Sequence, residues 1–360
     1  MTEPGYTTYS SFDILSKPWK ENHLPRKVLA IRMQALGDLV ITLPYLQQLR
    51  KDLPAQTKLH LLTRKESDGI PKNIFLFDKV YSVYGGRGYR NQLFYSSLLL
   101  PQLFFNRYDM VLDLQNNIIS RFFTKALMPK AWSLFDRSSP NAAGERTRAT
   151  IEAVGIGTCY ADTNFNLKNP KGGVHLLQNN GWETENDLVI LNPAGAFETR
   201  NWPIDHYAIL AKLWLKQFPK TQFIVMGVGS ISSKADYLKA ELGTRLINLV
   251  NQTTIAQAFI IVQMAKFVLS EDSGLMHMAW VSGIPTLTLF GSTRSDWARP
   301  LGKHTFFFDS SDLECGNCMK EHCKYGDTHC LTRYSPEMVF EKSISLIKSV
   351  NKFPEEIFRG

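Results

Sequence analysis

The first half of the chain alternates short apolar runs with longer stretches of helical periodicity. The first apolar run begins at Lys27, a glycine turn is predicted at 36–38, and residues 39–51 have helical spacing. Further strands are predicted at 58–63, 79–84, 109–115 and 131–136. Short apolar strands that alternate with helices are typical of a parallel sheet covered on both faces.

The same alternation starts again in the second half. Strands are predicted at 187–193, 221–227, 245–250, 266–272 and 285–291, and the helical segments between them include 205–218 and 254–265. Loop-rich sequence then continues to about residue 334. The pattern predicts two doubly wound α/β halves, which bind ligands in a crevice at the carboxyl ends of their strands.

Changes in composition along the chain predict where these two halves begin and end. Residues 1–25 are polar and aperiodic and are predicted to be an N-terminal extension. The two Rossmann-like domains are placed at 26–170 and 180–334, and the polar stretch 166–186 is the expected hinge. Ser335 and Pro336 start an amphipathic helix in the C-terminal segment 335–360, which could pack back on the first domain.

The 360 residues carry 41 Lys and Arg against 33 Asp and Glu, a formal charge of +8. This excess favours anionic partners such as nucleotide phosphates, an acidic glycolipid or an anionic membrane face. The basic residues are dispersed and no nucleic-acid-binding signature accompanies them, so nucleic acid is not predicted as a partner. The sequence has neither a long apolar span nor a secretory signal, and we expect a cytoplasmic protein.

Gly37 and Asp38 follow the first predicted strand. Gly37 permits a tight turn and the close approach of a ligand. Asp38 has two interpretations: it is the N-cap of the next helix, for which Asp is favoured, or a general base that faces the crevice and accepts the proton of an attacking hydroxyl.

The segment 191–214 contains a strand end, a loop of small residues and a helix that Pro203 opens. Arg200 stands in that loop, where its forked guanidinium could grip a diphosphate through two hydrogen bonds. The alternative is a solvated loop cation. Trp202 is predicted to be a packing residue.

The segment 270–293 carries the strongest chemical signal of the chain. A strand ends at Asp272, and Ser273 and Gly274 lead into a helix whose N-terminal N–H groups would bind an anion such as a pair of phosphates. Asp272 could accept hydrogen bonds from the hydroxyls of a sugar. His277, one turn later, could touch phosphate or support the loop, or it could be a core histidine.

These segments, together with Gly-Ile-Pro-Thr at 283–286 and Leu-Phe-Gly-Ser-Thr at 289–293, resemble the lipopolysaccharide heptosyltransferases of glycosyltransferase family nine over residues 27–345. The resemblance implies a GT-B fold, in which two Rossmann-like domains face a central cleft. It also implies inverting transfer of heptose from ADP-heptose to the lipopolysaccharide core, with no metal and no cofactor required. The domain at 26–170 would then bind the acceptor and the domain at 180–334 the nucleotide sugar.

The resemblance assigns roles to individual residues. The catalytic base falls on Asp38, the sugar-binding carboxylate on Asp272 and the supporting residues on Gly37 and His277. Arg200 stands where the family most often has a phosphate-binding lysine, which leaves the donor's identity less secure than its class. The backbone that binds phosphate falls on Ser273, Gly274 and Leu275. The absence of an Asp-x-Asp motif at a strand end agrees with a reaction that needs no metal.

Four cysteines form a separate cluster within the loop 315–330. Cys315, Cys318, Cys323 and Cys330 have spacings that can hold structural zinc through four thiolates. Free or redox-variable thiols are the alternative in a cytosolic chain.

An anionic glycolipid acceptor would need cations in the first domain, and contact with the inner membrane would need an apolar surface. Candidate cations stand in or near loops of that domain, at Arg64, Lys65, Arg121, Lys125, Arg137, Arg146 and Arg148. Most of them are expected to be solvated surface charges. The stretch 91–109 is rich in Leu and Phe. It is interpreted as a core helix, or as a contact of a peripheral enzyme with the cytoplasmic face of the inner membrane.

Three other functions fit parts of the sequence. A family-nine transferase could use another nucleotide diphosphate sugar, and a non-catalytic glycan- or nucleotide-sugar-binding protein could share the fold. The pair of Asp38 and Asp272 argues against the second of these. A Rossmann oxidoreductase is disfavoured because no G-x-G-x-x-G follows the first strand.

Overall fold

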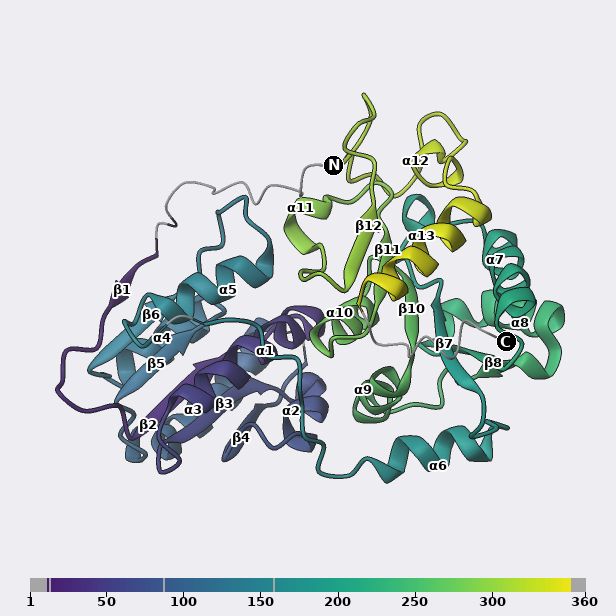
Figure 1. The fold of residues 1–360 in the computed structure, drawn as a ribbon. Coiled ribbons are helices and arrows are strands. Elements are labelled where there is room, and N and C mark those ends of the chain that lie inside the picture. Colours follow the sequence, from purple (N-terminus) through teal and green to yellow (C-terminus); the bar gives the residue numbers. More distant parts are fainter. Residues whose placement is uncertain (1–11, 13, 87, 158, 351–360) are drawn as a thin grey trace. The chain divides into compact units, whose positions relative to one another are not determined.

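The computed structural model describes residues 12, 14–86, 88–157 and 159–350, which form two α/β units, each built on a six-stranded sheet (Figure 1). The first unit comprises Met1–Gln34, Pro44–Asp68 and Leu76–Ala161. The second comprises Ala35–Leu43, Gly69–Phe75 and Asp162–Gly360. The predicted α/β class with two parallel, Rossmann-like sheets is therefore confirmed. The boundaries of the domains and the cleft between them stay predictions.

The sheet of the first unit has the strand order β1-β6-β5-β2-β3-β4. All its neighbours pair in parallel except β1, which runs antiparallel to β6. Its strands are β1 (Ser16–Lys17), β2 (Lys27–Ile31), β3 (Lys58–Arg64), β4 (Lys79–Val83), β5 (Met110–Asp113) and β6 (Ala131–Leu134). The helices along this part of the chain are α1 (Leu36–Asp52), α2 (Gly69–Asn73), α3 (Tyr89–Phe105), α4 (Ile118–Ala126) and α5 (Ala143–Glu152).

The core of the first unit lies between its sheet and the helices α3 and α4. Leu29 and Val111 of the sheet pack in one buried cluster with Leu103 of α3 and Phe123 of α4. The strands are buried on both faces, which is why β2 and β5 are almost continuously apolar in the sequence.

The sheet of the second unit has the order β12-β11-β10-β7-β8-β9 and is parallel throughout. Its strands are β7 (Asp187–Asn192), β8 (Thr221–Val225), β9 (Leu246–Asn248), β10 (Phe267–Glu271), β11 (Thr286–Leu289) and β12 (Thr305–Phe308). The helices along it are α6 (Lys171–Asn179), α7 (Ile204–Gln217), α8 (Ser232–Leu242), α9 (Ile255–Met264), α10 (Gly274–Val281), α11 (Ser295–Ala298), α12 (His329–Thr332) and α13 (Pro336–Ser349).

The C-terminal helix α13 packs within the second unit. Val339 and Ile347 of α13 join the buried cluster that contains Trp214 of α7, and Phe340 meets the ring of Trp214 edge-on at 6.0 Å. Ser335 caps the helix as predicted, because its side chain accepts a hydrogen bond from the N–H of Met338. Residues 351–360 of the predicted C-terminal segment lie outside the described residues.

Three segments differ from the sequence-based prediction. The expected hinge 166–186 contains the nine-residue helix α6, and the expected loop before residue 334 contains β12. The predicted extension contributes β1 to the first sheet, and the N–H of Trp19 donates to the carbonyl of Val154 at 2.8 Å. The rest of that extension, residues 1–11 and 13, lies outside the described residues. Among the helices of the described part, none has the length and apolarity that a bilayer span requires.

Candidate active site

The loop that joins β7 to α7 is closed by the carboxylate of Glu271, the last residue of β10. Its two oxygens accept hydrogen bonds from the N–H of Gly195 at 2.5 Å and the N–H of Trp202 at 2.7 Å. A Cβ at Gly195 would lie 2.3 Å from the carbonyl oxygen of Arg200, so only glycine fits where the loop turns back on itself. One buried carboxylate thus fixes both ends of the loop that carries Arg200.

Glu271 is fully buried, and burial raises its pKa to about 7. The neighbouring Lys234 and the hydrogen bonds from Gly195, Trp202 and Tyr207 lower the pKa, but they do not outweigh burial. Lys234, on α8, donates to the carbonyl of Pro193 at 2.8 Å and also to the side chain of Asn201. A second cation therefore contacts the loop that carries Arg200.

Arg200 and Asp272, both predicted from the sequence, form an ion pair between their side chains. Nη2 of Arg200 also donates to the carbonyl of Asp272 at 2.8 Å, and the guanidinium lies 5.1 Å from the ring centre of Phe197. The two side chains are largely but not fully buried, at 17% and 13% exposed. The structure therefore pairs Arg200, the residue predicted to bind phosphate, with Asp272, the residue predicted to bind the sugar.

Ser273 caps the helix α10. Its side chain accepts from the N–H of Met276 at 3.5 Å and from Nδ2 of Asn192 at 2.7 Å, and the same amide donates to Ser270 at 2.7 Å. Because the first N–H groups of a helix have no partner inside it, the amides of Gly274 and Leu275 lie at its positive end. A Cβ at Gly274 would meet no atom within 4 Å, so this helix start has open space around it.

Asp38 is the third residue of α1, which begins at Leu36 rather than after residue 38. The predicted glycine turn is therefore the first turn of the helix, and Asp38 is not its N-cap. The carboxylate of Asp38 instead accepts a hydrogen bond from the N–H of Ala35 at 3.0 Å. A Glu or Gln at the third position of a helix makes the same bond in a capping box. Asp38 is half-buried.

The segment Ala35–Leu43 groups with the second unit, where Gly37 contacts His277. A Cβ at Gly37 would lie 2.8 Å from Cδ2 of His277. Burial lowers the pKa of His277, while the nearby carboxylates of Asp272 and Asp38 raise it. Nδ1 of His277 accepts a hydrogen bond from the indole of Trp280 at 3.2 Å, which helps to hold the imidazole in its buried position.

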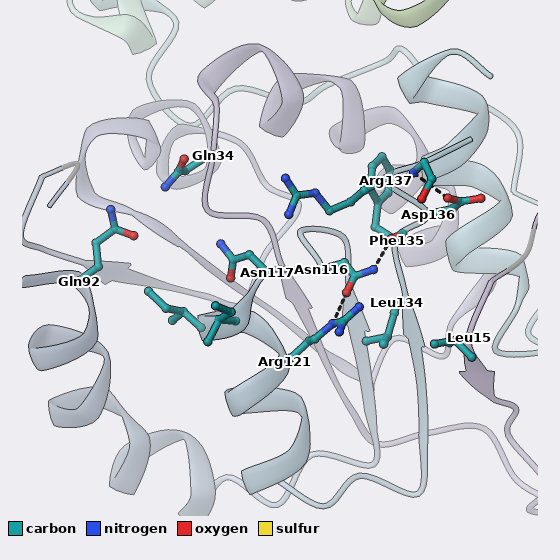
Figure 2. A pocket seen from close by; sticks show the side chains of 13 residues that line it. Leu15, Gln34, Gln92, Asn116, Asn117, Arg121, Leu134, Phe135, Asp136 and Arg137 are labelled. Atoms are coloured by element: carbon teal, nitrogen blue, oxygen red, sulfur yellow. Dashed lines mark hydrogen bonds between the residues drawn. The ribbon is translucent and has the colours of Figure 1, made fainter. Parts of the chain in front are cut away.

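A cavity of about 680 Å³ lies in the first unit, where the carboxyl ends of β5 and β6 meet the start of α4 (Figure 2). Arg121 donates to Asn116 at 2.5 Å, and Asn116 donates to the carbonyl of Phe135 at 2.6 Å. Figure 2 shows this chain of contacts on one side of the cavity and Arg137 on another. The lining is completed by Leu15, Gln34, Gln92, Asn117, Ile118, Ile119, Leu134, Asp136 and Ser138.

Of the seven cations predicted for an acceptor, Arg121 and Arg137 line this cavity and Lys125 lines the cavity next to it. Others are paired with carboxylates: Arg64 lies 3.2 Å from Glu66, Lys65 lies 3.3 Å from Asp68 and Arg148 lies 2.8 Å from Glu152.

The cysteine loop surrounds a different cavity, of about 710 Å³, in the second unit. Cys315, Cys318, Cys323 and Cys330 all line it, and all have free thiols. Burial, together with the three neighbouring thiols, raises the pKa of Cys330 to about 11. Among the described residues, no three His, Cys, Asp or Glu side chains are positioned to hold a metal ion. The structural zinc site stays a prediction.

Sequence reasoning missed Glu271, Lys234 and the role of the amide of Asn192. A glutamate inside an otherwise apolar strand was the available signal for Glu271, since a buried carboxylate needs several partners. Lys234 gave no signal, because it lies 33 residues along the chain from Asn201 in the loop that it contacts.

Two parallel Rossmann-like sheets, each covered by helices, are the architecture of the GT-B fold, and solved heptosyltransferases share it. The sequence profile of glycosyltransferase family 9 (heptosyltransferase) matches residues 99–329, and the chain belongs to this family.

Individual relatives agree with this assignment. Lipopolysaccharide heptosyltransferase 1 of Campylobacter coli is 24% identical over 301 residues, which cover 75% of this chain and 85% of the relative. A family 9 glycosyltransferase from Veillonella parvula is similar in structure, with a TM-score of 0.76, 16% identity and coverage of 90% and 97%. The ADP-heptose lipopolysaccharide heptosyltransferase II of Escherichia coli has a TM-score of 0.68, 18% identity and coverage of 89% and 98%.

Proposed function

We propose that the protein transfers heptose from ADP-heptose to the lipopolysaccharide core, with inversion and without a metal ion. The observation that carries this proposal is the arrangement near the start of α10, where Gly37, next to Asp38, packs against His277 and Arg200 pairs with Asp272. A carboxylate, a cation and a helix start thus belong to one small region. The name of the E. coli structural relative supplies the donor class.

The donor diphosphate would bind between Arg200 and the start of α10. Arg200 would release Asp272 and donate hydrogen bonds to the phosphate oxygens instead. The backbone amides of Gly274 and Leu275, at the N-terminal end of α10, would donate to the same diphosphate. Lys234, which donates to the carbonyl of Pro193, adds positive charge beside the loop. These groups would stabilise the leaving ADP electrostatically, as a divalent ion does in other transferases.

In the transfer step, the acceptor hydroxyl oxygen attacks the anomeric carbon as the bond from that carbon to the phosphate oxygen breaks. Asp38 takes the hydroxyl proton, and ADP leaves with the bonding electron pair. Asp272, released from Arg200, would accept hydrogen bonds from the sugar hydroxyls. A single displacement of this kind inverts the anomeric centre.

The acceptor would bind in the cavity of Figure 2. Arg121 and Arg137 suit phosphate or carboxylate groups of an inner-core glycan, and the amides of Gln34, Gln92, Asn116 and Asn117 suit its hydroxyls. The cavity is therefore proposed as the acceptor site of an anionic glycolipid.

The assignment of Asp38 is tested by Asp38→Ala and Asp38→Asn. Loss of a general base costs on the order of 10²–10⁴-fold in rate, so we expect kcat to fall by at least about 100-fold, while ADP binding stays within about twofold of wild type. Asp52→Asn, at the far end of the same helix, is the matched control and should transfer normally. Turnover near wild type in Asp38→Ala would exclude this base.

The donor and metal requirements are tested with the unmodified protein. Product analysis with ADP-heptose, UDP-sugars and GDP-sugars should show transfer from ADP-heptose alone, at the same rate in EDTA as in Mg²⁺. Preference for another nucleotide sugar would favour the alternative family-nine activity, for which Arg200 at a position usually held by lysine is the supporting observation. Binding without transfer from any donor would indicate a non-catalytic protein.

A further inference from the structure

The helix α3 exposes several of its large apolar side chains, while two of its polar side chains are buried. Gln92 and Ser96 are buried, whereas Phe94, Leu98 and Phe105 are 60%, 60% and 79% exposed. These three exposed residues have the spacing of one helical face. The interpretation of 91–109 as a core helix is therefore correct only for the buried side of α3. The side that carries these apolar residues is exposed, and no element of the described part of the chain covers it.

The neighbouring helix α4 extends this apolar face. Ile118 and Phe122 are 72% and 43% exposed, and Arg121 and Lys125 are exposed on the same side, at the spacing i, i+3, i+4, i+7. The two helices cover the same face of the first sheet, because β4-α3-β5 and β5-α4-β6 cross over in the same direction and Leu103 and Phe123 share one core.

We define the α3–α4 face as the outward side chains of these helices and of the turn that follows them. It consists of Leu93, Phe94, Leu98, Phe104, Phe105, Ile118, Phe122 and Met128, each more than a third exposed. A group of large exposed apolar side chains of this size is unusual on a surface that faces only water, and it indicates a contact with another apolar body.

The charge of the α3–α4 face has a single sign. Neither helix contains an Asp or a Glu, and their charged residues are Arg90, Arg121 and Lys125. Large apolar side chains beside cations alone are complementary to a bilayer with anionic headgroups, in which the apolar groups enter the interface and the cations meet phosphate. A face that binds a second protein chain would more often carry both positive and negative side chains.

The α3–α4 face is also continuous with the proposed acceptor site. A cavity of about 400 Å³ beside α4 is lined by Arg121, Lys125, Met128 and Trp132. It shares Leu15, Arg121 and Leu134 with the cavity of Figure 2. An acceptor whose glycan occupies the larger cavity would thus have its lipid end close to this face.

We propose that the α3–α4 face docks the protein on an anionic phospholipid surface. This proposal shares one assumption with the proposed function, namely that the acceptor is linked to a lipid. Its test measures vesicle binding without donor or transfer, so the two proposals can fail separately.

The test is co-sedimentation of the full chain with vesicles at low salt, using phosphatidylcholine alone or with one third phosphatidylglycerol. We expect binding to the anionic vesicles to be at least about tenfold stronger than to the neutral ones. The triple variant Phe94→Ser, Leu98→Ser, Phe105→Ser should lose at least about tenfold of that binding. The double variant Arg90→Gln, Lys125→Gln should weaken binding to anionic vesicles only.

Phe75→Ser with Val228→Ser is the matched control, since these side chains are 68% and 70% exposed outside the α3–α4 face. This control should bind as wild type does, and the circular dichroism of the triple variant should stay unchanged. The proposal is overturned if the wild-type protein does not bind anionic vesicles, or if the triple variant binds them as well as the control does. It is also overturned if wild type is a dimer that the triple variant converts to a monomer, because a second copy would then cover this face.

Discussion

At the scale of single residues, two adjacent carboxylates have different surroundings and different roles. Asp272 is partly exposed and pairs with Arg200, whereas Glu271 is fully buried and holds the backbone of the loop. Glu271 ends the buried strand β10, whereas Asp272 follows it in the turn before α10, which separates the two carboxylates. Sequence reasoning found Asp272 because it stands next to a recognisable helix start. It missed Glu271 because the partners of that carboxylate, Gly195 and Trp202, are 76 and 69 positions away.

Glu271 should make the stability of the protein depend on pH. An unfolded glutamate titrates near 4.5, and burial raises the pKa of Glu271 to about 7. Between these values the folded state binds the extra proton, so the free energy of unfolding should fall as pH rises from about 4.5 to 7, by up to about 3 kcal/mol. Below 4.5 and above 7 this contribution is constant.

Denaturant titration at a series of pH values measures this dependence, and Glu271→Gln is the variant to compare. The side-chain amide of this variant has only one acceptor oxygen and cannot accept both backbone hydrogen bonds in the same way, so the variant should be less stable near neutral pH. It should also show a flatter pH profile over the same interval. A variant profile parallel to that of wild type would mean that Glu271 is not the titrating group.

At the scale of elements, the apolar periodicity predicted the central strands well because they are buried on both faces. It failed for α6, where two glycines and polar residues give a weak helical signal. Packing on α9 compensates, since Gly173 allows the backbone of α6 to approach within van der Waals reach of Ile260. It failed also for β12, whose four residues are all only partly buried and lie in a loop-rich part of the sequence.

The loop between β7 and α7 should not tolerate a side chain at position 195. Gly195→Ala would place a Cβ 2.3 Å from the carbonyl oxygen of Arg200 and displace the guanidinium. We expect a loss of about 1–3 kcal/mol of stability and at least about tenfold weaker ADP binding, measured by thermal unfolding and calorimetry.

Gly172→Ala in α6 is the matched control, because a Cβ there would meet no atom within 4 Å. It should be neutral or slightly stabilising, since alanine favours a helix over glycine. Normal ADP affinity in Gly195→Ala would show that the loop does not position the phosphate ligand.

At the scale of the whole molecule, two sheets that share the order of five parallel strands carry different surfaces. The carboxyl ends of the second sheet present Arg200, Lys234 and the start of α10, and those of the first present the cavity of Figure 2. The repeated alternation of strands and helices predicted this duplication. The assignment of Ala35–Leu43 and Gly69–Phe75 to the second unit could not be predicted, because it depends on contacts that are distant in the sequence.

The short strand β1 has a practical consequence for anyone who shortens the chain. It pairs Ser16 and Lys17 with Ser133 and Trp132, and Leu15 beside it lines both cavities of the first unit. A chain that starts at Lys27 would leave the β6 edge with unpaired backbone groups, which recruit other edges. We expect such a chain to elute as aggregates on size-exclusion chromatography and to bind acceptor poorly. If the shortened chain were monomeric and bound acceptor with normal affinity, β1 would not be needed to protect the β6 edge or to form the cavities.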